Sequence, residues 1–135
     1  MRNLPIRDIG NHMEQQLEKL LRVTVFETDS RLKLQSPVDT GRFRVSWQIG
    51  QNAADGTPAP EGQYGTAIAA PKGSNYQAGQ EALGNYYSVH NNLPYAVPLT
   101  VLGTSKQAPA GWVDRIAREM QNFVNVNYER IKRES

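Results

Sequence analysis

Four basic side chains and two aromatic rings lie close together in this chain of 135 residues. These residue types suit the binding of nucleic acid, because arginine and lysine bind phosphate oxygens and aromatic rings stack on bases. The stretch between residues 31 and 44 holds one acidic residue against the four basic ones, a net charge of +3. The residues concerned are Arg31, Lys33, Arg42 and Arg44, with Phe43 and Trp47.

The positions of the rings argue against base stacking. Phe43 and Trp47 have the same parity in the predicted strand, which points both toward the interior and away from Arg44. Trp47 is therefore predicted to be a core residue. Runs of like charge are most often solvated faces. Binding of nucleic acid without sequence readout is kept as the alternative interpretation of the basic cluster.

Metal binding and catalysis have little support in the sequence. The histidines, His12 and His90, belong to different predicted elements, and neither lies at ligand spacing from a carboxylate. No signature of an activated nucleophile surrounds the serines and threonines near turns, which are Ser36, Thr40, Ser46 and Ser105. Residues 103–106 resemble part of a phosphate-binding loop that lacks its upstream glycine. We expect no enzyme activity, no metal and no cofactor.

Composition predicts a single domain over residues 1–135. The chain has no cysteine, which excludes disulfides and thiolate metal sites. No apolar run approaches the roughly 20 residues that span a bilayer, and the first residues contain no apolar signal core. We expect a soluble protein made in the cytoplasm, with no membrane partner. Apolar residues make up only 39% of the chain, which suggests that part of it is extended or is buried only in an assembly.

A corner is predicted between Ser36 and Trp47. Pro37 disfavours a helical conformation at the residue before it, so a preceding helix ends there. Asp39 and Thr40 are typical turn residues, because their side chains bond nearby backbone amides. Gly41 allows a positive φ, where a side chain would clash.

The stretch from Arg7 to Leu34 has helical periodicity, with apolar residues mostly three and four apart. At 1.5 Å per residue this helix would be about 40 Å long. Residues 23–28 are weaker helix formers, so a bend or break there is left open. One small sheet cannot cover so long a helix, and packing within the subunit or on a neighbouring copy both remain open.

Two strands and a long connection follow the corner. Residues 43–49 alternate apolar and polar as a half-buried strand does, and residues 86–91 form the second strand. Between them, alanine, glycine and proline make up half of residues 51–84. This insertion is predicted to contain a short strand over 66–70 and a weak helix over 74–83. A connection of this length is usually functional or disordered, so we expect either an arm that orders against a neighbouring subunit or a flexible surface loop.

The last helix has the strongest signal. A short helix over 95–102 and a loop over 103–108 are predicted to lead to Pro109, which suits the first turn of a helix. Apolar residues then recur at helical spacing from Trp112 to Ile131. The predicted fold class is α+β, with two long helices packed on a small antiparallel sheet and a long insertion rich in alanine, glycine and proline.

Three segments together resemble the small neck proteins of tailed bacteriophages, a family of head–tail connector and tail-completion proteins. They are Ser-Pro-Val-Asp-Thr-Gly-Arg-Phe-Arg-Val-Ser-Trp over 36–47, Asn-Asn-Leu-Pro-Tyr-Ala over 91–96 and Gly-Thr-Ser-Lys-Gln-Ala-Pro-Ala-Gly-Trp-Val over 103–113. The resemblance covers most of the chain. The chain departs from the family pattern at residues 97–100, where relatives often have an acidic residue, and at Trp112, where relatives often have methionine.

The resemblance implies a homo-oligomeric ring, sixfold or twelvefold, at the head–tail junction of the virion. It implies portal or adaptor proteins and tail-terminator or tail-tube proteins as partners. Genomic DNA would pass through the channel without sequence readout, and no catalysis is implied. The adaptor, tail-terminator and tail-completion roles all remain compatible with the sequence.

The resemblance also gives the motif residues roles that are structural first and interface-forming second. Asp39, Thr40 and Gly41 would fix the corner that aims Arg42 and Arg44. The remaining motif positions would fix a second corner and the start of the last helix; they are Asn91, Pro94 and Tyr95, then Gln107, Pro109 and Gly111. Arg31, Lys33, Arg42 and Arg44 would line an interface or the DNA channel.

Overall fold

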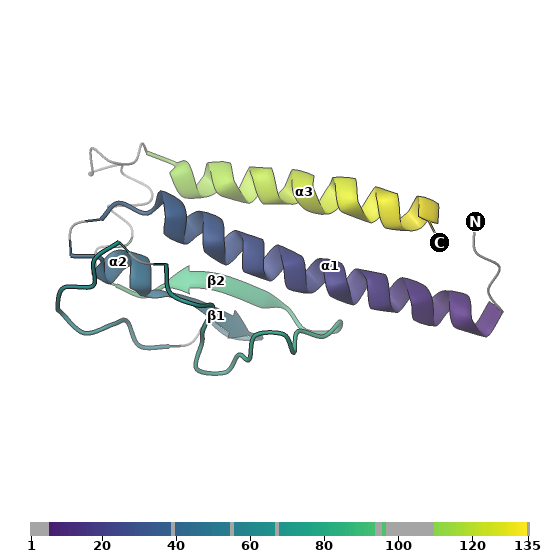
Figure 1. The fold of residues 1–135 in the computed structure, drawn as a ribbon, viewed down its shortest axis with the longest axis horizontal. Coiled ribbons are helices and arrows are strands. Elements are labelled where there is room, and N and C mark those ends of the chain that lie inside the picture. The colour runs from purple at the N-terminus through teal and green to yellow at the C-terminus, as the bar shows by residue number, and fades with distance from the viewer. Residues whose placement is uncertain are drawn as a thin grey trace.

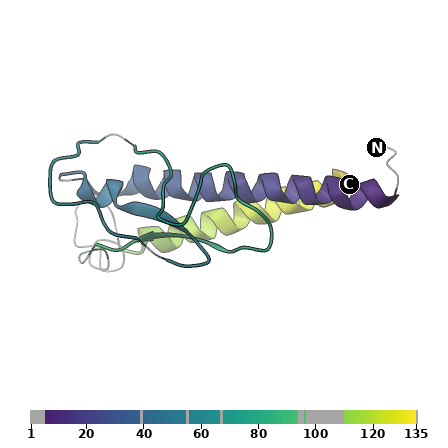
Figure 2. The same ribbon diagram turned by 90° about the horizontal axis from the view of Figure 1, so that it is seen from below.

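The computed structural model describes residues 6–38, 40–54, 56–66, 68–93, 96 and 110–134. In chain order its elements are α1 (Ile6–Gln35), α2 (Arg42–Val45), β1 (Trp47–Gln51), β2 (Tyr87–Asn91) and α3 (Trp112–Glu134). In Figure 1, α3 runs back along α1 in the opposite direction, and the sheet lies on another side of α1. Figure 2 shows that α3 is inclined to α1, with its first turns near the end that carries α2. The chain is α+β, with two long helices and a two-stranded antiparallel sheet.

Helix α1 is continuous over 30 residues, or about 45 Å. No break occurs at residues 23–28. The hydroxyls of Thr24 and Thr28 each donate to the carbonyl four residues earlier at 2.7 Å, so neither polar group competes for a non-helical conformation. The helix ends before Pro37, where the Ser36 hydroxyl donates to the Leu32 carbonyl at 2.6 Å. The predicted helix over residues 7–34 is therefore confirmed to within one residue at each end.

The predicted strand over residues 43–49 is wrong in its first half. Residues 42–45 form the single helical turn α2, and the strand begins only at Trp47. Gly41 starts this turn with a φ of 87°, and its carbonyl accepts the Val45 N–H at 3.0 Å. Phe43 and Trp47 are four residues apart, a spacing that puts them on one side in a strand and also in a helix. Both side chains are buried, at 4% exposed each, as they would be in either a strand or a helical turn.

Strands β1 and β2 pair antiparallel, with Trp47 opposite Asn91 and Gln51 opposite Tyr87. The second strand was predicted over 86–91 and is observed over 87–91. Its register sets Ile49 opposite Val89, and Ile49 is fully buried. The sheet therefore gives the subunit a small covered face beside α1.

The segment between the strands lies against its own chain. No helix forms over 74–83, and residues 66 and 68–70 are not in a strand; a single bridge joins Gly73 and Tyr76. The backbone of the segment bonds instead to the corner and β1. Thr57 accepts from the Gln48 side chain at 2.7 Å, and Lys72 accepts from the Ile49 N–H at 2.8 Å. A stretch rich in alanine, glycine and proline forms few regular ladders, so its carbonyls take their donors from elsewhere.

Two clusters of buried residues form the core. One joins the end of α1 and the corner to Leu93 and the first half of α3, through Leu32, Phe43, Trp47, Leu93, Trp112, Ile116 and Met120. The other joins the middle of α1 to β1 and the inter-strand segment, through Val25, Ile49 and Tyr76. The predicted last helix is confirmed, since α3 spans residues 112–134 and buries residues at helical spacing.

Several predicted features fall outside the described residues. These are Asp39, Pro94, Tyr95, Gln107 and Pro109, the loop over 103–108, and all of the short helix over 95–102 except Ala96. Within the described ranges, no helix is both long and apolar enough to cross a membrane.

Candidate functional site

The first and third motifs meet at Trp47. Its indole N–H donates to the Ser36 hydroxyl at 2.7 Å. The ring of Trp47 packs edge-on against Phe43, with centroids 5.6 Å apart, and against Trp112, with centroids 6.3 Å apart. Phe43 and Trp112 are themselves 6.5 Å apart. Three aromatic rings in mutual edge contact, two from one motif and one from another, fix where α3 begins relative to the corner.

The second motif joins the same cluster. The Asn91 amide donates to the Phe43 carbonyl at 2.9 Å, and its oxygen accepts the Leu93 N–H at 3.2 Å. Leu93 is 4% exposed and belongs to the cluster of Trp47 and Trp112. We call Ser36, Phe43, Trp47, Asn91, Leu93 and Trp112 the motif cluster. Segments up to 76 residues apart in the chain therefore build one buried unit.

The corner depends on Gly41. Its φ of 87° is in the left-handed region, and a Cβ there would overlap the carbonyl oxygen of Gly65. The carbonyl of Thr40 accepts the N–H groups of Tyr64 and Gly65, and the Thr40 hydroxyl accepts the Arg42 N–H at 3.2 Å. Thr40 and Gly41 thus hold the inter-strand segment against the corner. The buried Pro37 lies just before them.

The predicted basic cluster is not an open surface. Lys33 is completely buried, and its ammonium donates to Asp29 at 2.7 Å and to the carbonyls of Ala69 and Ala70 at 3.0 and 3.3 Å. The prediction that Lys33 lies at an interface or in a DNA channel is therefore wrong for this subunit. A helix lysine four residues after an aspartate is typical of a surface ion pair, and only the covering segment buries it.

The three arginines of the predicted cluster are also bound to their own chain. Arg42 donates to the Ala59 carbonyl at 2.7 Å, and Arg44 donates to the carbonyls of Thr66 and Leu34 at 2.7 and 3.2 Å. Arg31 pairs with the carboxylates of Glu27 at 3.0 Å and Glu119 at 3.8 Å. Arg42 and Arg44 each supply a donor to a carbonyl of the inter-strand segment, so the corner does not aim them away from the subunit.

The pair of Asp29 and Lys33 has unusual electrostatics for a small domain. Burial raises the pKa of the Asp29 carboxyl, and the hydrogen bond and charge of Lys33 oppose that rise. One carboxylate oxygen of Asp29 has no hydrogen-bond partner. Removing one member of such an ion pair strongly destabilises a protein, because the other member is left charged, buried and unpaired.

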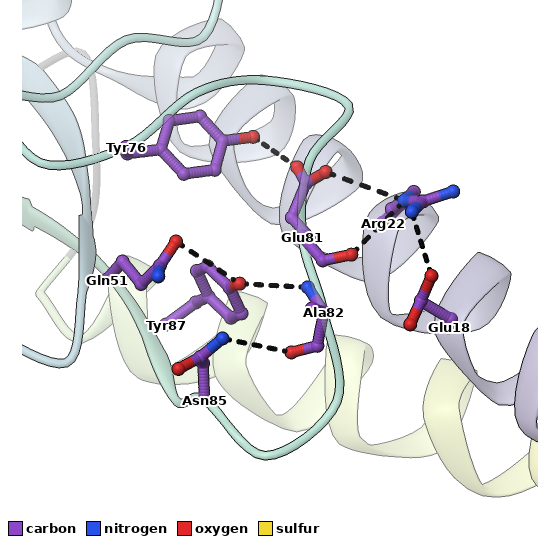
Figure 3. A network of polar contacts seen from close by, with 8 residues as sticks. All are labelled: Glu18, Arg22, Gln51, Tyr76, Glu81, Ala82, Asn85 and Tyr87. Atoms are coloured by element: carbon purple, nitrogen blue, oxygen red, sulfur yellow. Dashed lines mark hydrogen bonds and ion pairs between the residues drawn. The ribbon is translucent and has the colours of Figure 1, made fainter.

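A second polar network fixes the far end of the inter-strand segment to α1 (Figure 3). The Tyr76 hydroxyl donates to the carboxylate of Glu81, which is 3% exposed. Arg22 lies 3.9 Å from that carboxylate, donates to the Glu81 carbonyl at 3.3 Å and pairs with Glu18 at 2.9 Å. Burial, followed by the Glu81 hydrogen bond, raises the pKa of Tyr76 well above 10.0. Next to Glu81, the Ala82 N–H donates to the Tyr87 hydroxyl at 3.0 Å, which also binds this part of the segment to β2.

Sequence reasoning did not find Asp29, Tyr76 or Glu81. Tyr76 and Glu81 lie in a stretch dominated by turn residues, where acidic and aromatic residues are ordinarily exposed. The one available signal was that an aromatic residue and an acid stand five apart in an otherwise small-residue segment. Their partner Arg22 is 59 residues from Glu81, a separation that no local pattern reports.

No cluster of metal-ligating side chains occurs in the part of the chain that the structure describes. His90 contacts the Ser88 hydroxyl at 3.3 Å on β2. Comparisons of the chain with family models, curated proteins and solved structures found no match.

Proposed function

We propose that this chain is a structural virion protein that forms a homo-oligomeric ring at the head–tail junction of a tailed bacteriophage. One observation carries the proposal: described residues of all three motifs that resemble the neck family meet in the motif cluster. Segments that resemble a family separately and also build one unit together support a shared fold more strongly than any one of them does.

The surface of the subunit supports an assembled state. The chain exposes 8419 Å², whereas a compact monomer of its mass, 15.1 kDa, exposes about 7100 Å². The surplus of about 1300 Å² exceeds the roughly 800 Å² that one partner buries in a standard protein interface. A closed ring gives each subunit two such contacts, or about 1600 Å² in total, so the surplus is of the same order as the area that a ring subunit would bury.

Segment 51–84 forms part of the surface of the single subunit. Its described residues already bond to α1, the corner and β1, through Lys33, Arg42, Arg44 and Gln48. We propose that its outer side contacts a neighbouring subunit while its inner side stays on its own. The neck role would further involve portal or adaptor proteins on one side and tail proteins on the other, with DNA passing along the axis.

Purified virions provide the test. The protein should be present in them, and cryo-microscopy of the junction should resolve a sixfold or twelvefold ring of this chain. Particles produced without the chain should accumulate as separate heads and tails, and expression of the wild-type chain should restore joined particles. Absence of the protein from purified virions would exclude the proposal, as would joined particles in its complete absence.

A further inference from the structure

Helix α1 carries an uncovered apolar stripe. Val23, Phe26 and Leu34 are 43%, 55% and 61% exposed. With Ser30 between them they are spaced three, four and four residues apart, which places them on one face of the helix. Large side chains of this kind are usually buried, so several of them on one face of a helix mark a contact surface, here with the polar Ser30 between Phe26 and Leu34.

A pit opens beside this stripe. It is lined by Arg22, Val23 and Phe26 of α1 and by Pro71, Tyr76, Ala78, Gly79 and Glu81 of the inter-strand segment, and its volume is about 270 Å³. A cavity of roughly 150 Å³ already accommodates a benzene ring, so one large apolar side chain fits. The network of Tyr76, Glu81 and Arg22 holds the wall of the pit in place before anything binds (Figure 3).

The apolar surface continues across the helix pair. Val23 also lines a groove between α1 and α3, together with Leu20 and Phe123. Phe123 in turn lines a further hollow with Val126, which is 58% exposed. The stripe, pit and groove therefore form one continuous face, which we call the α1 face.

Charges of both signs are interspersed on the α1 face. Arg22 pairs with Glu18, and Arg31 pairs with Glu27 and Glu119. Lys19, Arg130 and Glu134 also line the groove, so the face has no single-sign field of the kind that attracts a phosphate backbone. Apolar side chains among charges of mixed sign suit a protein surface of similar composition, and the chain itself, with its surplus of exposed area, is such a surface.

We propose that a second copy of this chain covers the α1 face, with an apolar side chain of that copy in the pit. The arrangement of copies rests on the proposed function, because a ring uses two different patches on each subunit. The patch that enters the pit therefore lies elsewhere on the neighbour. An isologous dimer would instead bring the α1 faces of two copies together.

Photo-crosslinking tests this surface directly. The full-length variant Phe26→p-benzoylphenylalanine is incorporated into particles and irradiated, and mass spectrometry maps the linked peptides. The matched control is Asn125→p-benzoylphenylalanine, at an exposed position of α3 outside the lining of the α1 face. We expect a covalent dimer of this chain from position 26 and little from position 125, with the second peptide outside the α1 face.

Each outcome separates the inference from the proposed function. A dimer linked between position 26 of one copy and the α1 face of the other would support self-contact at this face and contradict a ring. A link from position 26 to a different virion protein, or equal dimer yields from both positions, would overturn the inference and leave the neck role intact. If the chain is absent from particles, the same variants are irradiated as concentrated purified protein, where failure to dimerise through position 26 overturns the inference.

Discussion

The corner at Gly41 offers the most quantitative test of the fold. In the Gly41→Ala variant the new Cβ meets two separate penalties. A left-handed backbone costs about 1–2 kcal/mol for a residue with a side chain. The Cβ also overlaps the Gly65 carbonyl, so the backbone must move and weaken the two bonds to the Thr40 carbonyl, at about 0.5–1.5 kcal/mol each. We expect a loss of about 2–5 kcal/mol in the free energy of unfolding.

Two matched glycines separate these penalties. Gly65 has a φ of 70° with open space around its Cβ position, so Gly65→Ala should lose only the backbone part, about 1–2 kcal/mol. Gly10 lies within α1, also with open space, and Gly10→Ala should stabilise the chain by about 0.5–1 kcal/mol. Urea unfolding followed by tryptophan fluorescence measures all three variants. If Gly41→Ala loses no more than Gly65→Ala, the close approach of the corner to the inter-strand segment is refuted.

Three further predictions concern polar contacts within the subunit. Lys33→Met should reduce the free energy of unfolding by about 3–5 kcal/mol, because it leaves the Asp29 carboxylate buried and unpaired. The double variant Asp29→Leu/Lys33→Met should lose less than the single variant. Equal losses of the two variants in urea unfolding would contradict a buried ion pair. Because the pKa of Tyr76 is raised above 10.0, the folded state keeps this proton longer than the unfolded state, so stability should fall as pH rises above 10.0. Tyr76→Phe should remove that part of the fall, and identical pH profiles of denaturation midpoint would contradict the assignment. Asn91→Asp should lose about 1–3 kcal/mol, since it replaces the donor to the corner carbonyl with an acceptor, and an unchanged melting temperature would count against the motif cluster.

The helices were predictable because their signal is local. An apolar residue every three or four positions is enough to indicate α1 and α3, and Pro37 marks the end of the first. The corner was only partly predictable. Gly41 indicated a positive φ, which the structure has at 87°, but the four-residue spacing of Phe43 and Trp47 fits a strand and a helical turn equally.

The contacts of the inter-strand segment could not be predicted from its sequence. Turn residues indicate where a chain changes direction, but they do not indicate what it then lies against. Lys33 shows the difficulty: its bonds to the carbonyls of Ala69 and Ala70 join residues 36 and 37 positions apart. Such bonds arise because carbonyls without a ladder partner need donors, and a long cationic side chain can supply them from another element.

The α1 face also bears on when a ring would form. Val23, Phe26 and Leu34 are already about half covered, so completing their burial contributes about 0.8–1.5 kcal/mol each, half of the value for full burial. Their sum is of the same order as, or below, the 4–15 kcal/mol or more that association costs in lost freedom of motion. The face alone therefore supports only weak self-association in dilute solution. Copies held side by side on a common platform have a high effective concentration, and closure of a ring engages two surfaces on every subunit. If the neck proposal holds, we expect the ring to form on its neighbour in the particle rather than free in solution, with sedimentation of the purified chain showing mainly monomer.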